Sequence, residues 1–321
     1  MNKRLILVGA ALAWCSATSQ ATNTQPELEQ VMTDLLQWLP GEYSSRPQRY
    51  LEGEQGASEE GQHDDWYRIF APVEVPHIGA NVIYGQMHIG NKDALIVPGT
   101  QVLYIVAMDP EHRAVSVSGR RIANGEDYAF PHLDPEKLKT IALDPDTGGN
   151  CDFRWRRHGN QLVGRLAEPD EAATDGTCTM TSKVSGVTMT WDAEWVLDAE
   201  QLWIFDNGYI EGELFIGRED LTHTRLYKTR FFDCKVSLED RGQSRAFELL
   251  MHDRGDEQAL GETGLTLRLL RGPMAGSDGF MEHTLLSVRR DADELFSQTL
   301  LPGDPSVIDL ELGNLTARCV R

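Results

Sequence analysis

The cysteines offer the clearest chemistry in this sequence, because a thiol can serve as a nucleophile, a zinc ligand or half of a disulfide. Four of them, Cys151, Cys178, Cys234 and Cys319, lie beyond the N-terminal apolar stretch. No Cys-x-x-Cys occurs, and no cysteine has a histidine at the spacing of a zinc site. An even number of cysteines in an exported chain predicts two disulfides, and the sequence alone allows three pairings.

Other catalytic signatures are missing from the sequence. The nine histidines are scattered, and there is no Gly-x-Ser-x-Gly, His-Glu-x-x-His or phosphate-binding glycine loop. We therefore expect no metal site and no hydrolase of these kinds. The formal net charge of −20 argues against a nucleic-acid partner, because a surface that negative repels phosphate backbones.

Aromatic residues gather on the predicted strands. In a barrel too wide to be filled, inward-facing aromatic rings line a ligand cavity. In a filled barrel they form an ordinary core, and the sequence leaves both interpretations open. The residues concerned are Trp66, Trp155, Trp191, Trp195, Trp203, Tyr43, Tyr84 and Tyr104.

The elements that must position these residues are mostly short strands. Apolar and polar residues alternate over 82–89, 101–107, 114–118 and 187–191, and turn signals such as Asp206-Asn207-Gly208 separate the runs. Many short strands joined by tight turns predict a mainly β protein, built as an antiparallel barrel or a sandwich.

Two helices are predicted beside the strands. The first covers residues 25–39 at helical spacing, and Pro40-Gly41 ends it where a strand begins. The second begins at Asp134-Pro135, where aspartate can cap a helix and proline suits its first position. Between them, the acidic, glycine-containing stretch 52–65 predicts a loop.

The two ends of the chain carry separate signals. A basic start, an apolar stretch and small residues up to Ala21 predict a cleaved signal peptide over residues 1–21, and hence a periplasmic or secreted protein. No other segment is apolar for long enough to span a membrane. We predict a barrel domain at 22–237 and a smaller C-terminal β-rich region at 238–321. A Cys234–Cys319 disulfide would tie the C-terminus back to the start of that region.

A family resemblance begins in the first helix. The pattern Leu36-x-Trp38-Leu39-x-Gly41-Glu42-Tyr43-Ser44-Ser45-x-x-Gln48 is followed by Asp134-Pro135-Glu136-Lys137-Leu138, by Gly149-Asn150-Cys151-Asp152-Phe153-Arg154-Trp155 and by Cys178. Over roughly residues 31–234, this order resembles the CpcT/CpeT family of bilin lyases, which attach chromophores to phycobiliproteins. The chain looks like an exported bacterial member with a C-terminal extension.

The resemblance implies a calycin-like antiparallel β-barrel with a short N-terminal helix. It places Cys151 and Cys178 on neighbouring strands, where they would form the second disulfide, and it implies a bilin or another tetrapyrrole as ligand. In a lyase of this kind a client thiolate adds to the bilin, and Tyr104 or an inward-facing Glu194 would donate the proton. The candidate ligand contacts are Gln48, Gln86, Gln101, Tyr84, Tyr104, Arg120 and Arg154.

Two features separate this chain from a bilin lyase. Where the family carries a Pro-Tyr-Arg-Gln-Arg-like segment, this sequence has Pro98-Gly99-Thr100-Gln101-Val102, without the arginines that would bind bilin propionates. Predicted export would also separate the protein from a cytosolic phycobiliprotein client.

Three functional hypotheses follow. The first is an exported barrel that binds an apolar or tetrapyrrole-like small molecule. The second is a bilin lyase-like enzyme that attaches a chromophore to a client cysteine. The third is a structural or partner-binding envelope protein whose barrel is filled by side chains. The client protein and the oligomeric state, a homodimer included, stay open.

Overall fold

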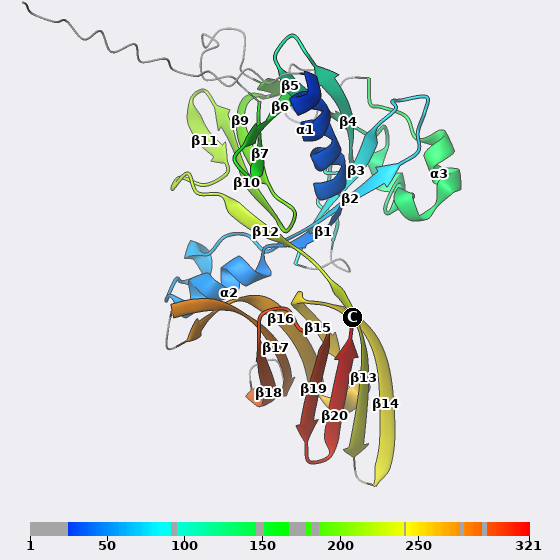
Figure 1. Cartoon of the computed structure of the whole chain (residues 1–321), viewed down its shortest axis with the longest axis vertical. Coiled ribbons are helices and arrows are strands. Elements are labelled where there is room, and N and C mark those ends of the chain that lie inside the picture. Colours follow the sequence, from blue (N-terminus) through cyan, green and yellow to red (C-terminus); the bar gives the residue numbers. More distant parts are fainter. Residues whose placement is uncertain are drawn as a thin grey trace, which may run out of the picture.

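The computed structural model describes residues 25–90, 95–145, 151–166, 178–181, 186–240, 242–276, 279–290 and 294–321 (Figure 1). The predicted signal peptide at residues 1–21 lies outside this part. The described helices are α1 (Gln25–Trp38), α2 (Arg46–Glu54) and α3 (Pro135–Thr140), with short 3-10 helices η1 (Glu59–Gly61), η2 (Gly125–Asp127), η3 (Pro131–Leu133) and η4 (Gly261–Thr263). Both predicted helices are confirmed, and Asp134 caps α3 by accepting a hydrogen bond from the Glu136 amide at 3.1 Å.

Ten antiparallel strands close into a barrel, which confirms the predicted fold class. Around the barrel they follow the order β1, β2, β3, β4, β5, β6, β7, β9, β10 and β12, and β12 pairs with β1 to close the ring. Two further strands lie outside the ring, β8 (Cys178–Thr181) beside β9 and β11 (Glu213–Ile216) beside β10. The barrel strands are β1 (Gly41–Ser44), β2 (Trp66–Val73), β3 (Val82–Ile89), β4 (Val102–Asp109), β5 (Ala114–Arg121), β6 (Asp152–His158), β7 (Gln161–Arg165), β9 (Thr188–Leu197), β10 (Gln201–Ile210) and β12 (Thr224–Lys228).

Helix α1 packs across one end of the barrel. Its buried Val31 and Leu35, and Leu39 just after it, join the apolar cluster of the barrel interior. The chain then turns into β1 at Gly41, whose φ of +146° disfavours any residue with a β-carbon. A β-carbon there would also lie 2.8 Å from the Cε atom of Lys228, so the flexible lysine side chain would have to move.

Aromatic rings lie over glycines of neighbouring strands inside the barrel. A β-carbon on Gly164 would lie 2.4 Å from the indole of Trp155, its cross-strand partner. Gly208 and its cross-strand partner Trp191 have the same relationship, at 2.7 Å, and a β-carbon on Gly85 would lie 2.5 Å from the ring of Tyr104 on the neighbouring strand. The glycines therefore make the space that these rings occupy, and much of the interior is filled by packed side chains.

Two four-stranded sheets form the C-terminal part (Figure 1). Their inward-facing residues share one apolar cluster, to which Phe232, Met251, Leu269 and Leu310 belong. The predicted domain limits stay a prediction, and the limit at 237/238 falls inside β13. One sheet has the strands β13 (Phe231–Asp240), β14 (Gln243–His252), β19 (Val307–Leu312) and β20 (Leu315–Val320); the other has β15 (Arg254–Ala259), β16 (Leu265–Gly276), β17 (Gly279–Arg290) and β18 (Glu294–Pro302).

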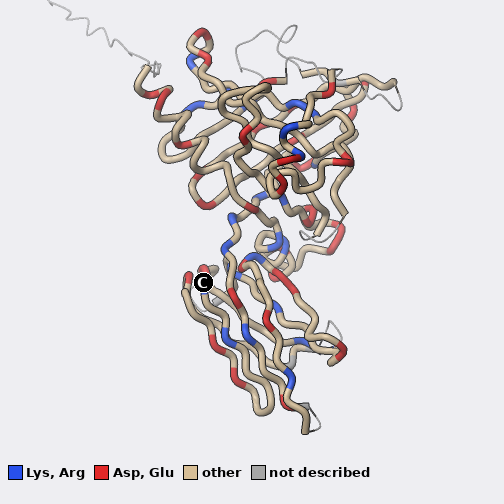
Figure 2. The backbone as a smooth tube through the Cα atoms, turned by 90° about the vertical axis from the view of Figure 1, so that its right-hand side faces the viewer, with Lys and Arg blue, Asp and Glu red and all other residues tan. Residues whose placement is uncertain are grey.

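Helix α2 and a cluster of buried charges join the barrel to these sheets. Tyr50 of α2 packs against the apolar side chains Leu270 and Met274 of β16. Asp253, which is fully buried, lies with its Oδ2 atom 2.5 Å from Nε of Arg271. Figure 2 shows lysines and arginines gathering at this narrow junction. The sequence did not predict α2, because its residues are mostly polar and it is held by tertiary contacts.

The structure contains both favoured disulfides. Cys151 and Cys178 have their Cα atoms 4.7 Å apart, and Cys234 and Cys319 have theirs 4.0 Å apart. Cys234 and Cys319 are opposite one another on the paired strands β13 and β20, so the bridge connects the last strand to the first strand of the C-terminal part. Two disulfides fit a protein of an oxidising compartment, extracellular or periplasmic. In the described part of the chain, every helix is too short or too polar to cross a membrane.

Candidate functional site

Three of the predicted ligand contacts lie together on the outer wall of the barrel. Tyr84 donates its hydroxyl hydrogen to Oε1 of Gln86 at 2.5 Å, and the backbone amide of Phe130 reaches the same oxygen at 3.1 Å. Gln101 is also buried, beneath Gly125 of the segment that covers this wall. Tyr84 and Gln86 thus bond to each other and to the covering segment, on the face opposite the barrel interior.

The other predicted contacts are dispersed. Gln48 lies on α2, where its side-chain oxygen accepts a hydrogen bond from the Arg225 amide at 2.6 Å. Arg120 lies 3.9 Å from Asp152, and Arg154 is the cross-strand partner of Ser116. The seven residues do not form one site, and a ligand-binding role for any of them stays a prediction.

Tyr104 is the one predicted residue whose side chain lies in the barrel interior. Its ring contacts Phe70 and Trp195, with centroids 5.8 and 5.9 Å away. Burial raises the pKa of Tyr104 to about 12, with a smaller increase from Asp206 and a decrease from Arg68. A hydroxyl with that pKa stays protonated and can bind a ligand by hydrogen bonding.

An arginine and an aspartate lie beside Tyr104. The guanidinium of Arg68 sits 5.2 Å from the ring centre of Trp66 and 5.4 Å from that of Trp195. Its Nη2 atom lies 3.7 Å from Oδ2 of Asp206, and the indole of Trp195 donates a hydrogen bond to Asp206 at 2.9 Å. We call Trp66, Arg68, Tyr104, Trp195 and Asp206 the interior cluster.

The interior cluster is charged but incompletely bonded. Arg68 and Asp206 keep only 11% and 16% of their side-chain surface exposed. Among the described residues, the buried Nε of Arg68 has no hydrogen-bond partner. Burial raises the pKa of Asp206, while Arg68 and the indole hydrogen bond lower it. A partly unsatisfied guanidinium among indole rings has the chemistry to bind an acidic group of a ligand.

Sequence reasoning found the tryptophans of the interior cluster but neither of its charges. Arg68 lies on the same face of β2 as Phe70, two residues further on, so the period of two groups it with Phe70, and the burial of Phe70 in the barrel core makes that face the interior. Asp206 was assigned to a turn, Asp206-Asn207-Gly208, and this is wrong because β10 continues through all three residues. The turn-like composition reflects the close contact of Gly208 with Trp191.

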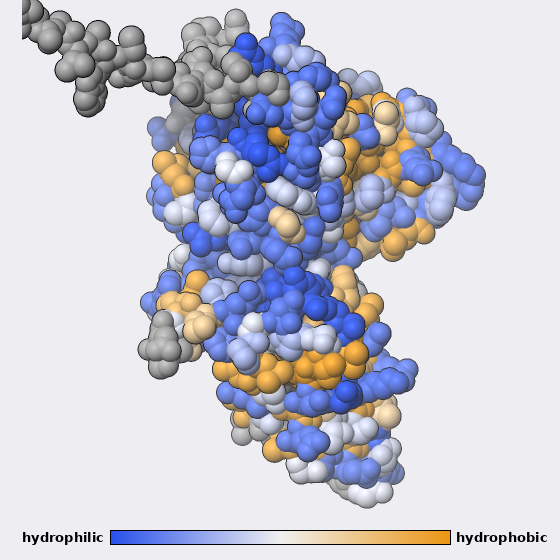
Figure 3. Space-filling model, viewed as in Figure 1, coloured by the Kyte–Doolittle hydropathy of each residue, from blue (hydrophilic) through white to orange (hydrophobic). Residues whose placement is uncertain are grey.

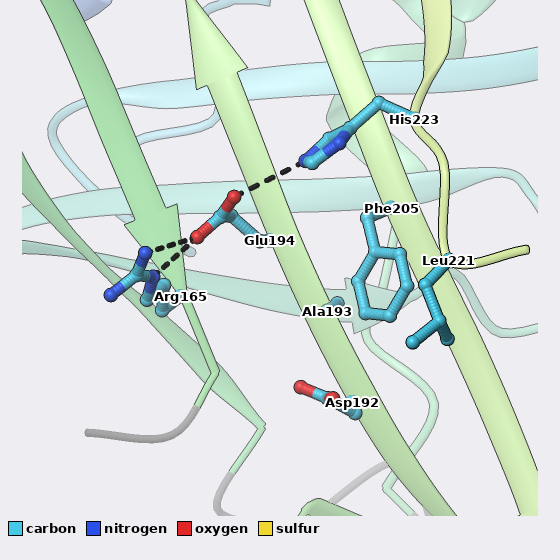
Figure 4. Close-up of a pocket in the computed structure, with 7 residues that line it drawn as sticks. All are labelled: Arg165, Asp192, Ala193, Glu194, Phe205, Leu221 and His223. Carbon is cyan, nitrogen blue, oxygen red and sulfur yellow. Dashed lines mark hydrogen bonds and ion pairs between the residues drawn. The ribbon is translucent and has the colours of Figure 1, made fainter. Parts of the chain in front are cut away.

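Glu194 does not face the interior, which corrects the prediction made for it. Its neighbours Ala193 and Trp195 belong to the interior core, so Glu194 is on the outer face of β9. There it forms an ion pair with Arg165, and its Oε1 atom lies 3.2 Å from Nε2 of His223 (Figure 4). These residues line a groove of about 270 Å³ together with Asp192, Phe205 and Leu221, which we call the outer groove.

A second histidine, His63, has neighbours like those of a catalytic relay but does not form one. The Nδ1 atom of His63 lies 2.5 Å from Glu52, and its Nε2 atom lies 3.0 Å from the hydroxyl of Thr222. The Thr222 hydroxyl, however, donates its hydrogen to Asp220 at 2.7 Å. Asp220 is ionised because its hydrogen bonds with Arg218 lower its pKa. The hydroxyl is therefore not activated by His63, and the contacts tie α2 to the segment 217–223. Within the described ranges, no group of three or more potential ligands could hold a metal ion.

Comparisons with known proteins identify no family for this chain. No family model matches the chain, and no curated protein matches it. Among solved structures, the chain is similar to the CRL protein of Arabidopsis, solved with selenomethionine, at 14% identity and a TM-score of 0.44. The match covers 62% of this chain and 97% of that chain.

Proposed function

We propose that the protein binds a small, largely apolar molecule that carries an acidic group, and that the interior cluster is the binding site. A β-barrel is compatible with such a role. The observation that carries the proposal is the guanidinium of Arg68, held between two indole rings inside the barrel with its Nε atom unbonded among the described residues.

The chemistry of the cluster favours this class of ligand. Burying a guanidinium costs free energy unless its N–H donors are hydrogen-bonded. The closest approach of Asp206 to the guanidinium of Arg68 is 3.7 Å, which is too long for a hydrogen bond. A carboxylate from a ligand would complete the bonding of Arg68, while Trp66 and Trp195 would contact the apolar body. Tyr104 would stay a neutral donor, because its pKa is about 12.

A tetrapyrrole-like molecule is the finer form of the proposal. It rests on the sequence resemblance to the CpcT/CpeT family, whose bilin ligands carry propionates. The hydroxyl of Thr100, at a position where that family has arginine, bonds to the backbone oxygen of Val97 at 2.7 Å. Arg68, from a different strand, would supply a guanidinium in its place. We propose export to the periplasm or the exterior as the setting, in keeping with the two disulfides.

A structural protein with a filled barrel is the second candidate. The fit of Trp155 onto Gly164 and the packing of α1 across one end support it. The two candidates differ over the interior cluster, because only the binding candidate gives the Nε atom of Arg68 a hydrogen-bond partner.

The test is a titration with biliverdin, followed by bilin absorbance and by quenching of tryptophan fluorescence. We expect saturable binding that Arg68→Met weakens about 10- to 100-fold, the range for a lost hydrogen bond to a charged group. Arg120→Met, on the outer wall, is the matched control and should bind like the wild type. Equal affinities of the Arg68 and Arg120 variants would contradict the proposed site, and no binding would favour the filled barrel.

A further inference from the structure

The outer groove lies on the opposite side of the barrel wall from the interior cluster. Arg165 of β7, Asp192 and Glu194 of β9, and Phe205 of β10 line it, and the segment 217–223 forms its far side. Figure 4 shows the ring of Phe205 and the side chain of Leu221 side by side, with the charged groups across from them. The groove therefore has one apolar wall and one charged wall.

The two carboxylates of the groove differ in their bonding. Both carboxylate oxygens of Glu194 have partners. Oε2 forms an ion pair with Arg165, and Oε1 lies 3.2 Å from Nε2 of His223. Asp192 makes no hydrogen bond or ion pair with the described residues, although Arg165 acts on it through space. Because Arg165 pairs with Glu194, Asp192 is a carboxylate of the groove that has no ion pair with any of the described residues.

The far side of the groove is held in place. Asn207, which is buried, accepts a hydrogen bond from the Arg218 amide at 3.2 Å. Leu221 adopts φ of +55°, a left-handed conformation that leucine rarely takes, and its side chain is 60% exposed. Its exposed side chain lies beside Phe205 and extends the apolar wall of the groove.

We propose that the outer groove binds a small primary amine, with the ammonium at Asp192 and a short aliphatic chain on Phe205 and Leu221. The ammonium would pair with Asp192, which has no ion pair within the described part of the chain, and Phe205 would add a cation–π contact. An alkyl chain would cover the apolar wall. This site is separate from the interior cluster, so it adds a second ligand class to the proposed function.

The charged groups of the groove set its expected pH dependence. Burial raises the pKa of Asp192, the charge of Glu194 raises it further and Arg165 lowers it. Binding requires ionised Asp192, so affinity should fall as the pH drops through this raised pKa. The other charged or titratable groups that line the groove are Arg165, Glu194 and His223, whose Nε2 atom lies 3.2 Å from Glu194.

The test is a titration of the folded protein with n-pentylammonium, followed by ligand-observed NMR at low salt. Asp192→Asn should weaken binding about two- to fivefold, the scale of an exposed ion pair. Arg165→Met should tighten it, because Glu194 would then face the ammonium without its own cation. Asp233→Asn, an exposed acid on β13, is the matched control for Asp192→Asn and should change nothing.

Two further measurements make the proposal falsifiable. n-Pentanol, which has the same chain without the charge, should bind more weakly than n-pentylammonium. Arg68→Met should leave amine binding unchanged, which separates this site from the interior cluster. Equal binding of pentanol, an Asp192→Asn variant with wild-type affinity, or no saturable amine binding at all would each overturn the proposal.

Discussion

Arg68 and Asp206 face each other inside the barrel, with Nη2 of the arginine 3.7 Å from Oδ2 of the aspartate. A charged pair in a core is expensive to desolvate and is weak evidence for stability. An apolar pair of similar volume would fill the same space at no electrostatic cost. The position of the pair beside three aromatic rings is therefore in keeping with the binding site proposed above.

The first prediction concerns the pH dependence that Asp206 gives to folding. Its pKa is raised in the folded state, mainly by burial, so folded protein binds this proton more readily than unfolded protein. The resulting stabilisation is fully present below the pKa that Asp206 has in the unfolded chain, and it is lost as the pH rises through the pKa of Asp206 in the folded protein. The stability of the wild type relative to Asp206→Asn should therefore decrease between acidic and neutral pH. Urea unfolding of both proteins at several pH values measures this, and an increase with pH would contradict it.

The second prediction concerns the close fit of Trp155 onto Gly164. Gly164→Ala would place a β-carbon 2.4 Å from the indole, so the ring or the strand must move. We expect a loss of roughly 1–3 kcal/mol in the free energy of unfolding, typical of overpacking a core. Gly61→Ala is the control, because Gly61 is exposed and would meet only the Ser58 hydroxyl, at 3.2 Å. Chemical unfolding compares the two, and equal losses would count against a tightly filled interior.

The alternation of residues predicted the strands well but could not assign their faces. A period of two says that Glu194 and Trp195 point to opposite sides, and not which side is the interior. That choice is made by contacts between distant strands, such as those of Trp195 with Phe70 and Tyr104. Glu194 was therefore expected inside and is found on the outer wall.

The failure to predict helix α2 from the sequence has a similar cause. Residues 46–54 carry few apolar side chains, and α2 forms because Tyr50 packs on β16 and buried Gln48 bonds to Arg225. Both contacts join segments that are far apart in the sequence. The corner at Gly41 was predictable, in contrast, because its proline–glycine pair acts locally.

The third prediction compares the two disulfides. Cys151–Cys178 spans 27 residues and Cys234–Cys319 spans 85. On the chain-entropy model, removing the longer bridge should cost about 1 kcal/mol more than removing the shorter one. Double serine variants, Cys151→Ser with Cys178→Ser and Cys234→Ser with Cys319→Ser, measure the two costs by chemical unfolding. A larger loss for the shorter bridge would show that the folded state, and not the unfolded chain, sets the difference.

The last prediction is that the protein does not attach a bilin covalently to a phycobiliprotein client. Thioether formation needs a bilin held by its propionates and a proton donor at the reacting carbon. Thr100 and Val102 supply no guanidinium, so Arg68 of another strand would replace only one of the two arginines of the family, and the second missing charge-assisted bond costs roughly 1.5–3 kcal/mol. Tyr104, with a pKa of about 12, is a weak acid, and Glu194 lies outside the barrel.

The measurement mixes apo-client, bilin and protein, denatures the mixture and follows bilin fluorescence on the client polypeptide. We expect no transfer above the spontaneous rate, while absorbance of the bilin with the protein alone shifts and the shift disappears on denaturation. Arg68→Met should abolish much of that reversible shift, because it removes the guanidinium proposed to hold the acidic group. Transfer above the spontaneous rate would support the lyase instead, since covalent attachment survives denaturation and simple binding in the barrel does not.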